Sequence, residues 1–559
     1  MAVSNNDIAA QLGQLAQLLR SQGANRFKVK AYRVAAEAIQ NYPQRLSAVL
    51  AEGKPLPKIP GVGSSIASAI SEIIESGELT SVRKLSEKLP AGTAEIAHSA
   101  GLSIREARQL VTTLAVKSAD ELRERLKSGD LPPAVGERLA YKVRQGLQNA
   151  RRLLWKDAQT LAAHYLAALK TVRGIDRIET AGSLRRGRET VGTIRFVVRT
   201  VSSSTSRSIR AMLRKHGGIE LLEEDSPART TCRLAAGPLL VVRTTDAADF
   251  GTALIEETGS LAHLQSVSTH AKASRKAAAT EKAWYAARGL PFIPPELREG
   301  RGEVEAAIAG ELPTLVELSD IRGDLHAHTT SSDGANTIEE MAAAARKRGY
   351  EYLAITDHSK SLRITDGLDE KRLARQMASI DRYNAGQSGF RVLKGSEVDV
   401  LEDGTLDFAD GVLRRLDIVI ASIHSRFALD RAAQTRRLLR AIENRYVTCL
   451  GHLTGRKLLK RPGYELDLER VLKAVKRHGK LLEINASPDR LDMDDVLAKR
   501  ARELGIPLLV NTDAHSIREL DFMPFGVRQA RRGWQTRETV VNTRPLPEMM
   551  RALAATRGR

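Results

Sequence analysis

The feature that most limits how this chain can fold is a series of short apolar runs, each followed closely by a histidine or an acidic residue. The series begins at Asp324-Leu325-His326-Ala327-His328, with Asp333 close behind, and it ends at Asp513-Ala514-His515. Side chains alternate along an extended strand, so His326 and His328 point the same way and can face one cation. A lone His-x-His pair is a weak signal, and the remaining runs therefore decide the interpretation.

The other runs repeat this form. Each is predicted to be a buried parallel strand with polar residues at its end. The strands and the residues after them are 352–355 before Asp357 and His358, 391–393 before Glu397, 418–421 before His424, 446–450 before His452, 481–484 before Asn485, and 507–510 before Asp513 and His515. The segments between them, 365–384, 431–444, 465–479 and 493–504, are predicted to be amphipathic helices. Alternating strands and helices predict a parallel sheet or barrel whose active site lies at the C-terminal strand ends.

Histidines concentrate at these strand ends. Seven histidines follow residue 320, and all but His478 occupy the positions given above. His478 stands at a basic helix end and is interpreted as a solvated surface residue. The other six are expected to converge on a metal centre rather than to be satisfied core histidines. A mixed set of imidazoles and carboxylates suits manganese, iron or zinc better than magnesium.

The same residues resemble, motif by motif, the PHP (polymerase and histidinol phosphatase) domain. All nine positions that the resemblance marks as metal ligands are filled here: His326, His328, Asp333, His358, Glu397, His424, His452, Asp513 and His515. The resemblance implies two or three divalent ions, with manganese as the usual ion and Zn²⁺ or Fe²⁺ also compatible. It also implies hydrolysis of a phosphoester, with Glu397, Asp513, His326 and His358 as the central catalytic residues.

The resemblance further implies how the ligands divide among the ions, with Glu397 bridging two metals. The three expected groups are His326, His328 and Asp513 for one ion, His424 and His452 for a neighbour, and Asp333, His358 and His515 for a third. Metals a few ångström apart would clamp a phosphate and activate a water. Arg426 and Arg456 are candidates for contact with substrate phosphates. A surface ion pair is the alternative for each arginine.

The charge of the chain narrows the choice of partner. Lysine and arginine number 87 against 67 aspartates and glutamates, and the net charge of +20 favours a polyanion, with nucleic acid first. Cys232 and Cys449 are the two cysteines, so neither a disulfide framework nor a thiolate zinc site is expected. No apolar run approaches the length of a membrane span and no secretory segment is recognised. The protein is predicted to be cytoplasmic.

Residues 1–85 are predicted to form a small helical unit. Gly61-Val62-Gly63-Ser64 stands between apolar helical segments and suits a helix-hairpin-helix motif. Its glycines let the backbone approach a phosphate, and the following helix supplies free N–H groups and a positive dipole end. Such a motif binds DNA phosphates without reading the sequence, although a purely structural turn is the alternative. A second, weaker copy that lacks the first glycine is predicted at 132–147, beginning around Leu131–Arg138.

Residues 150–320 resemble the palm and thumb of a family X DNA polymerase. The motifs that carry the resemblance are 181–192, which begins Ala-Gly-Ser-Leu-Arg-Arg-Gly, 250–254 and Thr258-Gly259-Ser260. The resemblance implies that the Gly-Ser turn and the following arginine hold the triphosphate of an incoming nucleotide. It also implies three aspartates on two strands that bind the two magnesium ions of nucleotidyl transfer.

Those three aspartates are absent from this chain. Thr193 and Arg195 stand at the paired positions and Val241 at the third. A threonine, a cation and a valine cannot hold magnesium, which needs oxygen ligands, so the polymerase site is predicted to be lost while the fold is kept. Glu256-Glu257 replaces the aromatic pair of the sugar pocket. The helix after the hairpin turn, 64–69, has no lysine, so an amine-based lyase is not expected.

The whole chain is therefore expected to be multidomain and to resemble bacterial family X polymerases that carry a C-terminal PHP domain. The expected parts are an N-terminal helical domain with the helix-hairpin-helix motif at 1–85, a second helical, fingers-like region at 86–150, a degenerate α+β palm and thumb at 151–315, and a PHP domain with a distorted (β/α)7 barrel at 321–559. The stretch 291–323, with its Pro294-Pro295 pair, is read as the join before the barrel.

The favoured function is a manganese-dependent 3′→5′ DNA exonuclease in repair, acting on primer–template, nicked or gapped DNA. The expected protein is a monomer associated with the nucleoid, and its polymerase-like half serves as a DNA-holding platform. A small-molecule phosphatase of the histidinol-phosphate kind is a second interpretation, which the basic charge and the hairpin disfavour. A non-catalytic DNA-binding scaffold and a residual DNA polymerase are the remaining alternatives. The full ligand set argues against the first and the missing aspartates against the second.

Overall fold

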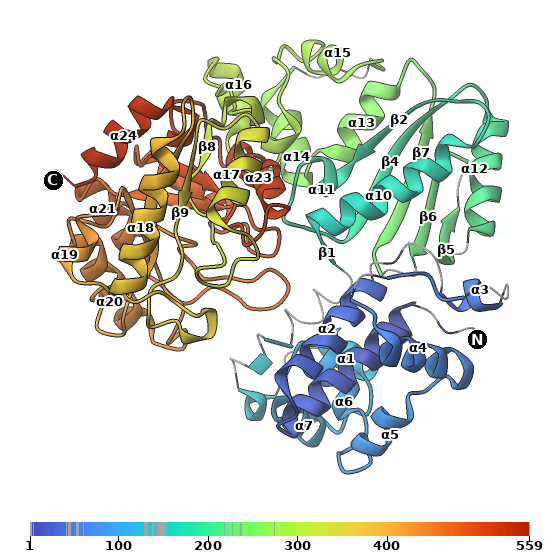
Figure 1. The fold of residues 1–559 in the computed structure, drawn as a ribbon. Helices are drawn as coiled ribbons and strands as arrows, with labels where there is room; N and C mark the ends of the chain where they lie inside the picture. Colours follow the sequence, from blue (N-terminus) through green and yellow to red (C-terminus); the bar gives the residue numbers. More distant parts are fainter. Residues whose placement is uncertain are drawn as a thin grey trace. The chain divides into compact units, whose positions relative to one another are not determined.

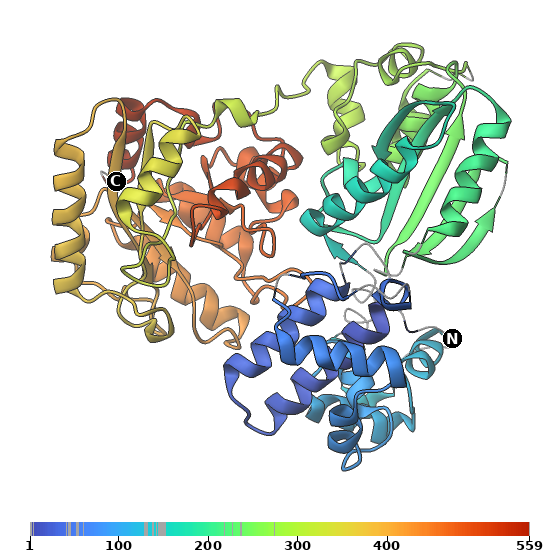
Figure 2. The ribbon, with the colours of Figure 1, turned by 45° about the vertical axis from the view of Figure 1, so that its right-hand side comes forward.

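The computed structural model describes the chain except residues 1, 2, 4, 41, 43–45, 52–54, 60, 128–131, 137, 138, 141, 144–151, 217, 226, 235, 236, 273, 275, 558 and 559. The chain divides into two compact units, Met1–Ser260 with Ala271–Phe292, and Leu261–His270 with Ile293–Arg559. Figures 1 and 2 colour the first unit blue to green, and most of the second yellow to red. Within the described part of the chain, no helix combines the length and apolar character that crossing a bilayer requires.

The first unit begins with a bundle of short helices, drawn in blue in Figure 1. They are α1 (Asn5–Ser21), α2 (Arg26–Gln40), α3 (Leu46–Ala51), α4 (Ser64–Ser76), α5 (Thr80–Ser86), α6 (Thr93–Ser99), α7 (Ile104–Leu114) and α8 (Ala119–Lys127). Ile8, Leu12 and Leu15 recur at helical spacing on α1 and pack with Ile70 and Ile73 of α4 in one buried cluster. The apolar periodicity of the sequence therefore produces this core.

The predicted second hairpin copy lies only partly within the described residues. Pro133–Val135 forms one 3-10 turn, and Gly136 follows it with a φ of +76°. Leu131, Glu137 and Arg138 lie outside the described residues. The second copy therefore stays a prediction.

A five-stranded mixed sheet follows, drawn in teal and green in Figures 1 and 2. Its strands are β2 (Ile175–Ala181), β4 (Thr193–Thr200), β5 (Ile219–Asp225), β6 (Arg229–Leu234) and β7 (Leu239–Thr245), in the order β2-β4-β7-β6-β5. β4 and β7 run parallel, and the other neighbours are antiparallel. The helices of this region are α10 (Trp155–Lys170), α11 (Gly182–Arg185), α12 (Ser203–Lys215), α13 (Phe250–Thr258) and α15 (Glu281–Ala286). Strands β1 (Leu153–Leu154) and β3 (Thr190–Val191) pair beside them.

The second unit contains a parallel sheet of seven strands, each joined to its neighbour in sequence order. They are β8 (Gly323–Asp324), β9 (Tyr352–Ile355), β10 (Arg391–Asp399), β11 (Ile418–Ser422), β12 (Cys449–Leu450), β13 (Leu481–Asn485) and β14 (Leu508–Asn511). The connecting and flanking helices are α17 (Ile338–Lys347), α18 (Glu370–Ala385), α19 (Asp410–Leu413), α20 (Arg431–Glu443), α21 (Leu468–Arg477), α22 (Asp495–Glu503), α23 (Met523–Arg532) and α24 (Leu546–Ala555). A parallel bridge from Ala327 to Ala514 joins the two ends, so the sheet is a nearly closed barrel of seven strands, which confirms the predicted distorted (β/α)7 barrel.

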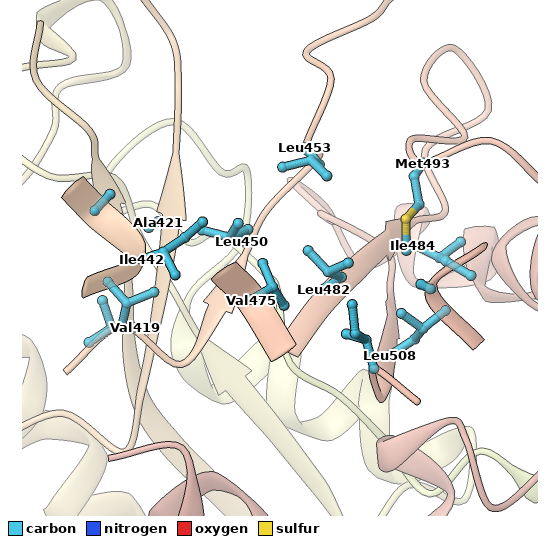
Figure 3. Close-up of a cluster of buried hydrophobic side chains, with 14 of the residues drawn as sticks. Val419, Ala421, Ile442, Leu450, Leu453, Val475, Leu482, Ile484, Met493 and Leu508 are labelled. Atoms are coloured by element: carbon cyan, nitrogen blue, oxygen red, sulfur yellow. The ribbon is translucent and has the colours of Figure 1, made fainter. Parts of the chain in front are cut away.

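Both faces of these strands are buried, which explains why their sequences are continuous apolar runs. Ile418 and Ile420 of β11 pack into the interior with Leu393. The alternate residue Val419 packs outward with Ile442 of α20, and Figure 3 shows this outer layer, in which Val475, Leu482 and Leu508 also lie. The sequence cannot assign a residue to one face or the other, because both faces are apolar.

Aspartates set where the barrel helices begin. Asp369, Asp430, Asp467 and Asp494 each precede a helix, and each side chain accepts a hydrogen bond from a backbone N–H in the first turn. Helices α18, α21 and α22 therefore start a few residues later than the periodicity predicts. The predicted strand 446–450 is also shorter than expected, because only Cys449 and Leu450 pair with neighbours.

The segment before β8 packs against the barrel through buried ion pairs. It includes α14 (Leu261–His270), the turn Pro295–Leu297 and α16 (Glu303–Ala309). Glu296 Oε1 lies 2.7 Å from Arg528 Nη1 and 2.9 Å from Arg531 Nε of α23. The predicted join at 291–323 is therefore ordered along much of its length. The finer domain boundaries at 85, 150 and 315 stay predictions.

Candidate metal centre

The barrel brings the predicted ligands to the C-terminal ends of its strands. His326 and His328 follow β8, His358 follows β9, and Glu397 lies near the end of β10. His424, His452, Asp513 and His515 follow β11, β12 and β14, and Asp333 comes from the loop after His328. The backbone at His452 and Asp513 has φ values of 27° and 55°, unusual for residues with side chains. Such conformations cluster at functional sites, where the surrounding fold holds them.

Glu397 lies at the centre of this group, and its two carboxylate oxygens face different histidines. Oε2 lies 2.9 Å from His358 Nδ1, 3.4 Å from His326 Nε2 and 3.7 Å from His328 Nε2. Oε1 lies 2.8 Å from His452 Nε2 and 3.3 Å from His424 Nε2. A carboxylate in this position can serve two neighbouring cations, one on each oxygen.

Asp513 and Asp333 extend the group on the other side of His328. Asp513 Oδ1 lies 3.1 Å from His328 Nε2 and 3.5 Å from His326 Nε2. Asp333 lies 3.4 Å from His515 Nε2 and 3.6 Å from His358 Nε2. Three sets could each hold a cation with ligand atoms within 4.8 Å of one another: His326, His328, Glu397 and Asp513; His328, Asp333, His358 and His515; and His358, Glu397 and His424.

Several buried ligand atoms lack a hydrogen-bond partner. They are His326 Nε2, His328 Nδ1, His358 Nδ1, Glu397 Oε2 and His452 Nδ1. A buried polar atom without a partner is costly in a folded protein unless a further group satisfies it. His326 Nε2 and His358 Nδ1 both face the unpaired Glu397 Oε2, at 3.4 Å and 2.9 Å, and all three atoms are good ligands for a divalent cation, so these residues fit such an ion. These clusters indicate divalent metal binding.

The ionisation of the two central carboxylates, and the neutral form of His328, suit a cation as well. Burial opposes ionisation of Glu397, but His424, His358 and His326 outweigh it and hold the pKa of that carboxyl well below its ordinary value. The pKa of Asp513 is likewise well below its ordinary value, because His326 and other histidines outweigh burial. Burial, followed by the repulsion of His515 and His358, lowers the pKa of His328 to about 3. Ionised carboxylates and a neutral imidazole are the forms that bind metals.

Two further carboxylates orient the ligands, and sequence reasoning missed both roles. Glu483 Oε1 lies 2.7 Å from His326 Nδ1, and Asp399 Oδ1 lies close to His424 Nδ1. A carboxylate on the second ring nitrogen fixes the tautomer and orientation of a ligating histidine. Both had a signal in the sequence: Glu483 interrupts an apolar strand, and Asp399 lies two residues after Glu397, on the same side of β10.

The two arginines predicted to contact phosphate differ in their surroundings. Arg426 is exposed, and its Nε lies 2.9 Å from Glu402 Oε2. Arg456 is mostly buried, and its Nε and Nη2 donate to the backbone carbonyls of Arg490 and Leu491. Arg456 therefore supports the loop after β13. Contact of either arginine with a substrate phosphate stays a prediction.

The polymerase-like sheet places the three altered positions together. Arg195 pairs directly with Val241 across β4 and β7, and Thr193 lies two residues earlier on β4. Glu257 of α13 is buried, and it accepts from Arg195 Nη1 at 2.6 Å and Arg229 Nη1 at 2.5 Å. Guanidinium groups and a carboxylate thus fill the region where the resemblance calls for magnesium.

The hairpin turn is exposed at the start of α4. Gly61 has a φ of +83°, and a Cβ there would lie 2.7 Å from Val34 Cγ1, so only glycine fits without a shift. Gly63 precedes α4 without a side-chain cap, and Val62 is half-buried while Ser64 is exposed. First-turn N–H groups at such a helix start suit a phosphate.

Comparison with known protein families supports both motifs. Residues 3–79 match the family model of a helix-hairpin-helix domain, and residues 324–487 match that of the PHP domain. These matches confirm the two domains that the sequence motifs predict.

Similar proteins fall into two groups. The chain is 35% identical over 567 residues to a DNA polymerase/3′-5′ exonuclease PolX of Bacillus subtilis (strain 168), which covers 97% of this chain and 98% of that protein. A probable phosphatase of Thermoanaerobacter sp. (strain X514) is 33% identical over 231 residues, 39% of this chain and 89% of that protein. A probable phosphatase of Caldicellulosiruptor saccharolyticus is 32% identical over 205 residues, 34% of this chain and 79% of that protein.

Proposed function

Because this chain belongs to the bacterial PolX family of X-type DNA polymerases with a C-terminal PHP domain, we propose that it is a manganese-dependent 3′→5′ DNA exonuclease. The observation that carries the proposal is the arrangement of the potential ligands: eight of the nine fall in three overlapping groups that could each hold a cation, and the ninth, His452, has its Nε2 2.8 Å from Glu397 Oε1. The PHP domain makes the chain a metal-dependent phosphoesterase, and the direction of digestion, the ion and a role in base excision or gap repair are the proposed refinements.

The proposed ligands are the nine residues of the cluster. We propose that two or three divalent ions, Mn²⁺ in place of the chemically compatible Zn²⁺ or Fe²⁺, would be held by His326, His328, Asp333, His358, Glu397, His424, His452, Asp513 and His515. Such ions lower the pKa of water and neutralise charge on a phosphate. Neighbouring histidines keep the Glu397 and Asp513 carboxylates ionised. Glu483 and Asp399 orient the imidazoles of His326 and His424.

The polymerase-like half is proposed to bind DNA without extending it. Arg195 forms an ion pair with Glu257, and neither Thr193 nor Val241 offers a carboxylate to a metal ion. The hairpin at Gly61-Val62-Gly63-Ser64 and the net charge of +20 support a platform for primer–template, nicked or gapped DNA. The proposed protein is a cytoplasmic, nucleoid-associated monomer.

A small-molecule phosphatase is the second candidate. The similarity to probable phosphatases over the PHP domain favours it. Against it stand the helix-hairpin-helix domain and the full-length similarity to PolX, because a small phosphomonoester requires neither.

One assay separates the two candidates. Labelled single-stranded DNA and p-nitrophenyl phosphate are each incubated with the full chain and Mn²⁺, Mg²⁺ or EDTA. The proposal expects stepwise shortening from the 3′ end with Mn²⁺, little with Mg²⁺, and none with EDTA. Rapid p-nitrophenyl phosphate hydrolysis with intact DNA would instead establish the phosphatase.

A further inference from the structure

Arg490 is a guanidinium group beside the metal centre that belongs to none of the ligand sets. It lies in the loop between β13 and α22, and its Nε is 3.8 Å from Asp513 Oδ2. This separation is longer than a hydrogen bond. Asp513 Oδ2 accepts a hydrogen bond from Asn485 Nδ2 at 3.0 Å. The Asp513 carboxylate is therefore held in place without Arg490, and the guanidinium N–H groups of Arg490 do not hydrogen-bond to it.

The backbone around Arg490 is fixed by neighbouring groups. Arg456 Nε donates to the carbonyl of Arg490 at 3.0 Å, and Arg456 Nη2 donates to that of Leu491. One residue earlier, Asp489 accepts from Ser487 Oγ at 2.9 Å and from Lys457 Nζ at 2.8 Å. The loop is thus held on both sides of Arg490 while its side chain points at the metal centre, which is the arrangement that a preorganised binding group needs.

Nearby cations are engaged elsewhere. Lys457 pairs with Asp489. Arg461 donates to the carbonyl of Gly455 at 2.7 Å and lies over the ring of Phe427 at 4.1 Å. Arg456 binds backbone, as described above, and Arg426 pairs with an exposed glutamate. In the described part of the chain, Arg490 is therefore the cation nearest Asp513 that keeps its donors for another anion.

We propose that Arg490 binds the scissile phosphate, donating from its guanidinium to the non-bridging oxygens of the phosphodiester. A guanidinium matches the geometry of a phosphate with two parallel N–H donors, and its fixed charge stabilises the charge that develops during hydrolysis. The side chain is only 15% exposed, so the contact forms where water screens it little. The proposal rests on the function proposed above and adds a catalytic residue to it.

The test uses the full chain with Mn²⁺ and compares Arg490→Ala and Arg490→Lys with the wild type. Arg440→Ala is the matched control, since Arg440 is an exposed arginine that pairs with Asp403 on the surface. Three quantities are measured: Mn²⁺ bound per chain, binding of inorganic phosphate by calorimetry, and kcat and KM for the p-nitrophenyl ester of thymidine 5′-monophosphate.

Arg490→Ala is expected to keep its Mn²⁺, to lose phosphate binding, and to lower kcat/KM by about 10²- to 10³-fold. Free guanidinium should restore part of that rate, and Arg490→Lys should fall between the two. Unchanged phosphate binding in Arg490→Ala, or a defect that follows loss of Mn²⁺, would overturn the proposal. If the wild type bound Mn²⁺ and phosphate but cleaved no phosphodiester, the proposed function would fail while the phosphate contact of Arg490 could still be judged by calorimetry.

Discussion

At the scale of single residues, Glu397 is the residue on which the proposed metal centre depends most. Both of its carboxylate oxygens face histidines, and it belongs to two of the three ligand sets. Replacing Glu397 with alanine removes the bridging carboxylate, and replacing His326 or His358 removes a direct ligand. Each change is expected to reduce phosphodiester hydrolysis to background. His478→Ala is the control, because His478 follows α21 at a basic helix end away from the ligand sets. Full nuclease activity in Glu397→Ala, with folding checked by circular dichroism, would contradict the proposed centre.

Substitution of Asp399, a carboxylate outside the ligand sets, is expected to reduce activity less than substitution of a ligand. It touches His424 Nδ1 and accepts a hydrogen bond from Ser361 Oγ at 2.6 Å, so it orients the imidazole without reaching the ion. Asp399→Asn is expected to weaken the affinity for Mn²⁺ by about 10- to 100-fold. The measurement is the concentration of Mn²⁺ that gives half-maximal activity, which should rise by that factor. Asp403→Asn, an exposed aspartate in the next loop, should leave that concentration unchanged. An unchanged concentration in Asp399→Asn would show that the contact does not tune the metal.

Most ligand residues could be proposed from the sequence because they follow apolar runs, and strand ends meet at one edge of a parallel sheet, whereas Asp333 lies in a loop and was indicated by the family resemblance. The sequence marks Glu483 and Asp399 as carboxylates near the site, but it cannot show that each contacts a histidine, since that depends on which ring nitrogen faces inward. Arg490 was missed for a related reason. It lies in a loop five residues beyond β13, and no periodicity places a loop side chain.

At the scale of elements, the hairpin turn before α4 gives a local test of DNA binding. Gly61→Ala puts a Cβ 2.7 Å from Val34 in a left-handed conformation, so the turn must shift. It is expected to weaken binding of gapped DNA several-fold while leaving hydrolysis of a p-nitrophenyl ester unchanged. Gly77→Ala, at the other end of α4, has a similar φ of +79° but no atom within 4 Å of the added Cβ. Fluorescence anisotropy should find Gly77→Ala close to the wild type, and equal losses in both variants would argue for general strain instead.

The ion pairs between Glu296, in the segment before β8, and helix α23 of the barrel lead to a prediction about stability. Burial opposes the charged form of Glu296, but Arg528 and Arg531 outweigh it and hold the pKa of Glu296 below its ordinary value of 4.5. A depressed carboxyl pKa stabilises the fold above the unfolded value and loses that contribution as the pH falls through the folded value. Glu296→Gln should therefore cost about 3 kcal/mol at neutral pH, and the cost should shrink below pH 4.5.

The control for this measurement is Glu317→Gln. Glu317 pairs with the same Arg531, but it is 64% exposed, so its loss should cost about 0.5 kcal/mol or less. Urea unfolding at neutral and acid pH measures both variants. A Glu296→Gln cost that is independent of pH would show that the ion pair is not what stabilises the segment.

At the scale of the whole molecule, we propose that one chain combines a polymerase-like half that has lost its metal ligands and a PHP half that keeps a full set. The sequence predicts the loss, because Thr193, Arg195 and Val241 replace aspartates. It does not predict what fills the space, since the pairing of Arg195 with Val241 and the reach of Glu257 depend on strand register and helix position. The two-part design follows from sequence alone, whereas the docking of residues 293–320 on the barrel required the structure.

The PHP half is proposed to hydrolyse DNA, and the polymerase-like half is proposed to bind DNA without extending it. The most direct test of this proposal uses DNA with a one-nucleotide gap, a labelled primer, all four dNTPs and Mn²⁺. The wild type is compared with Glu397→Ala, in which the nuclease cannot mask synthesis. The wild type is expected to shorten the primer from its 3′ end, and Glu397→Ala is expected neither to shorten nor to extend it. Template-directed extension by Glu397→Ala, or shortening as fast as in the wild type, would contradict the account.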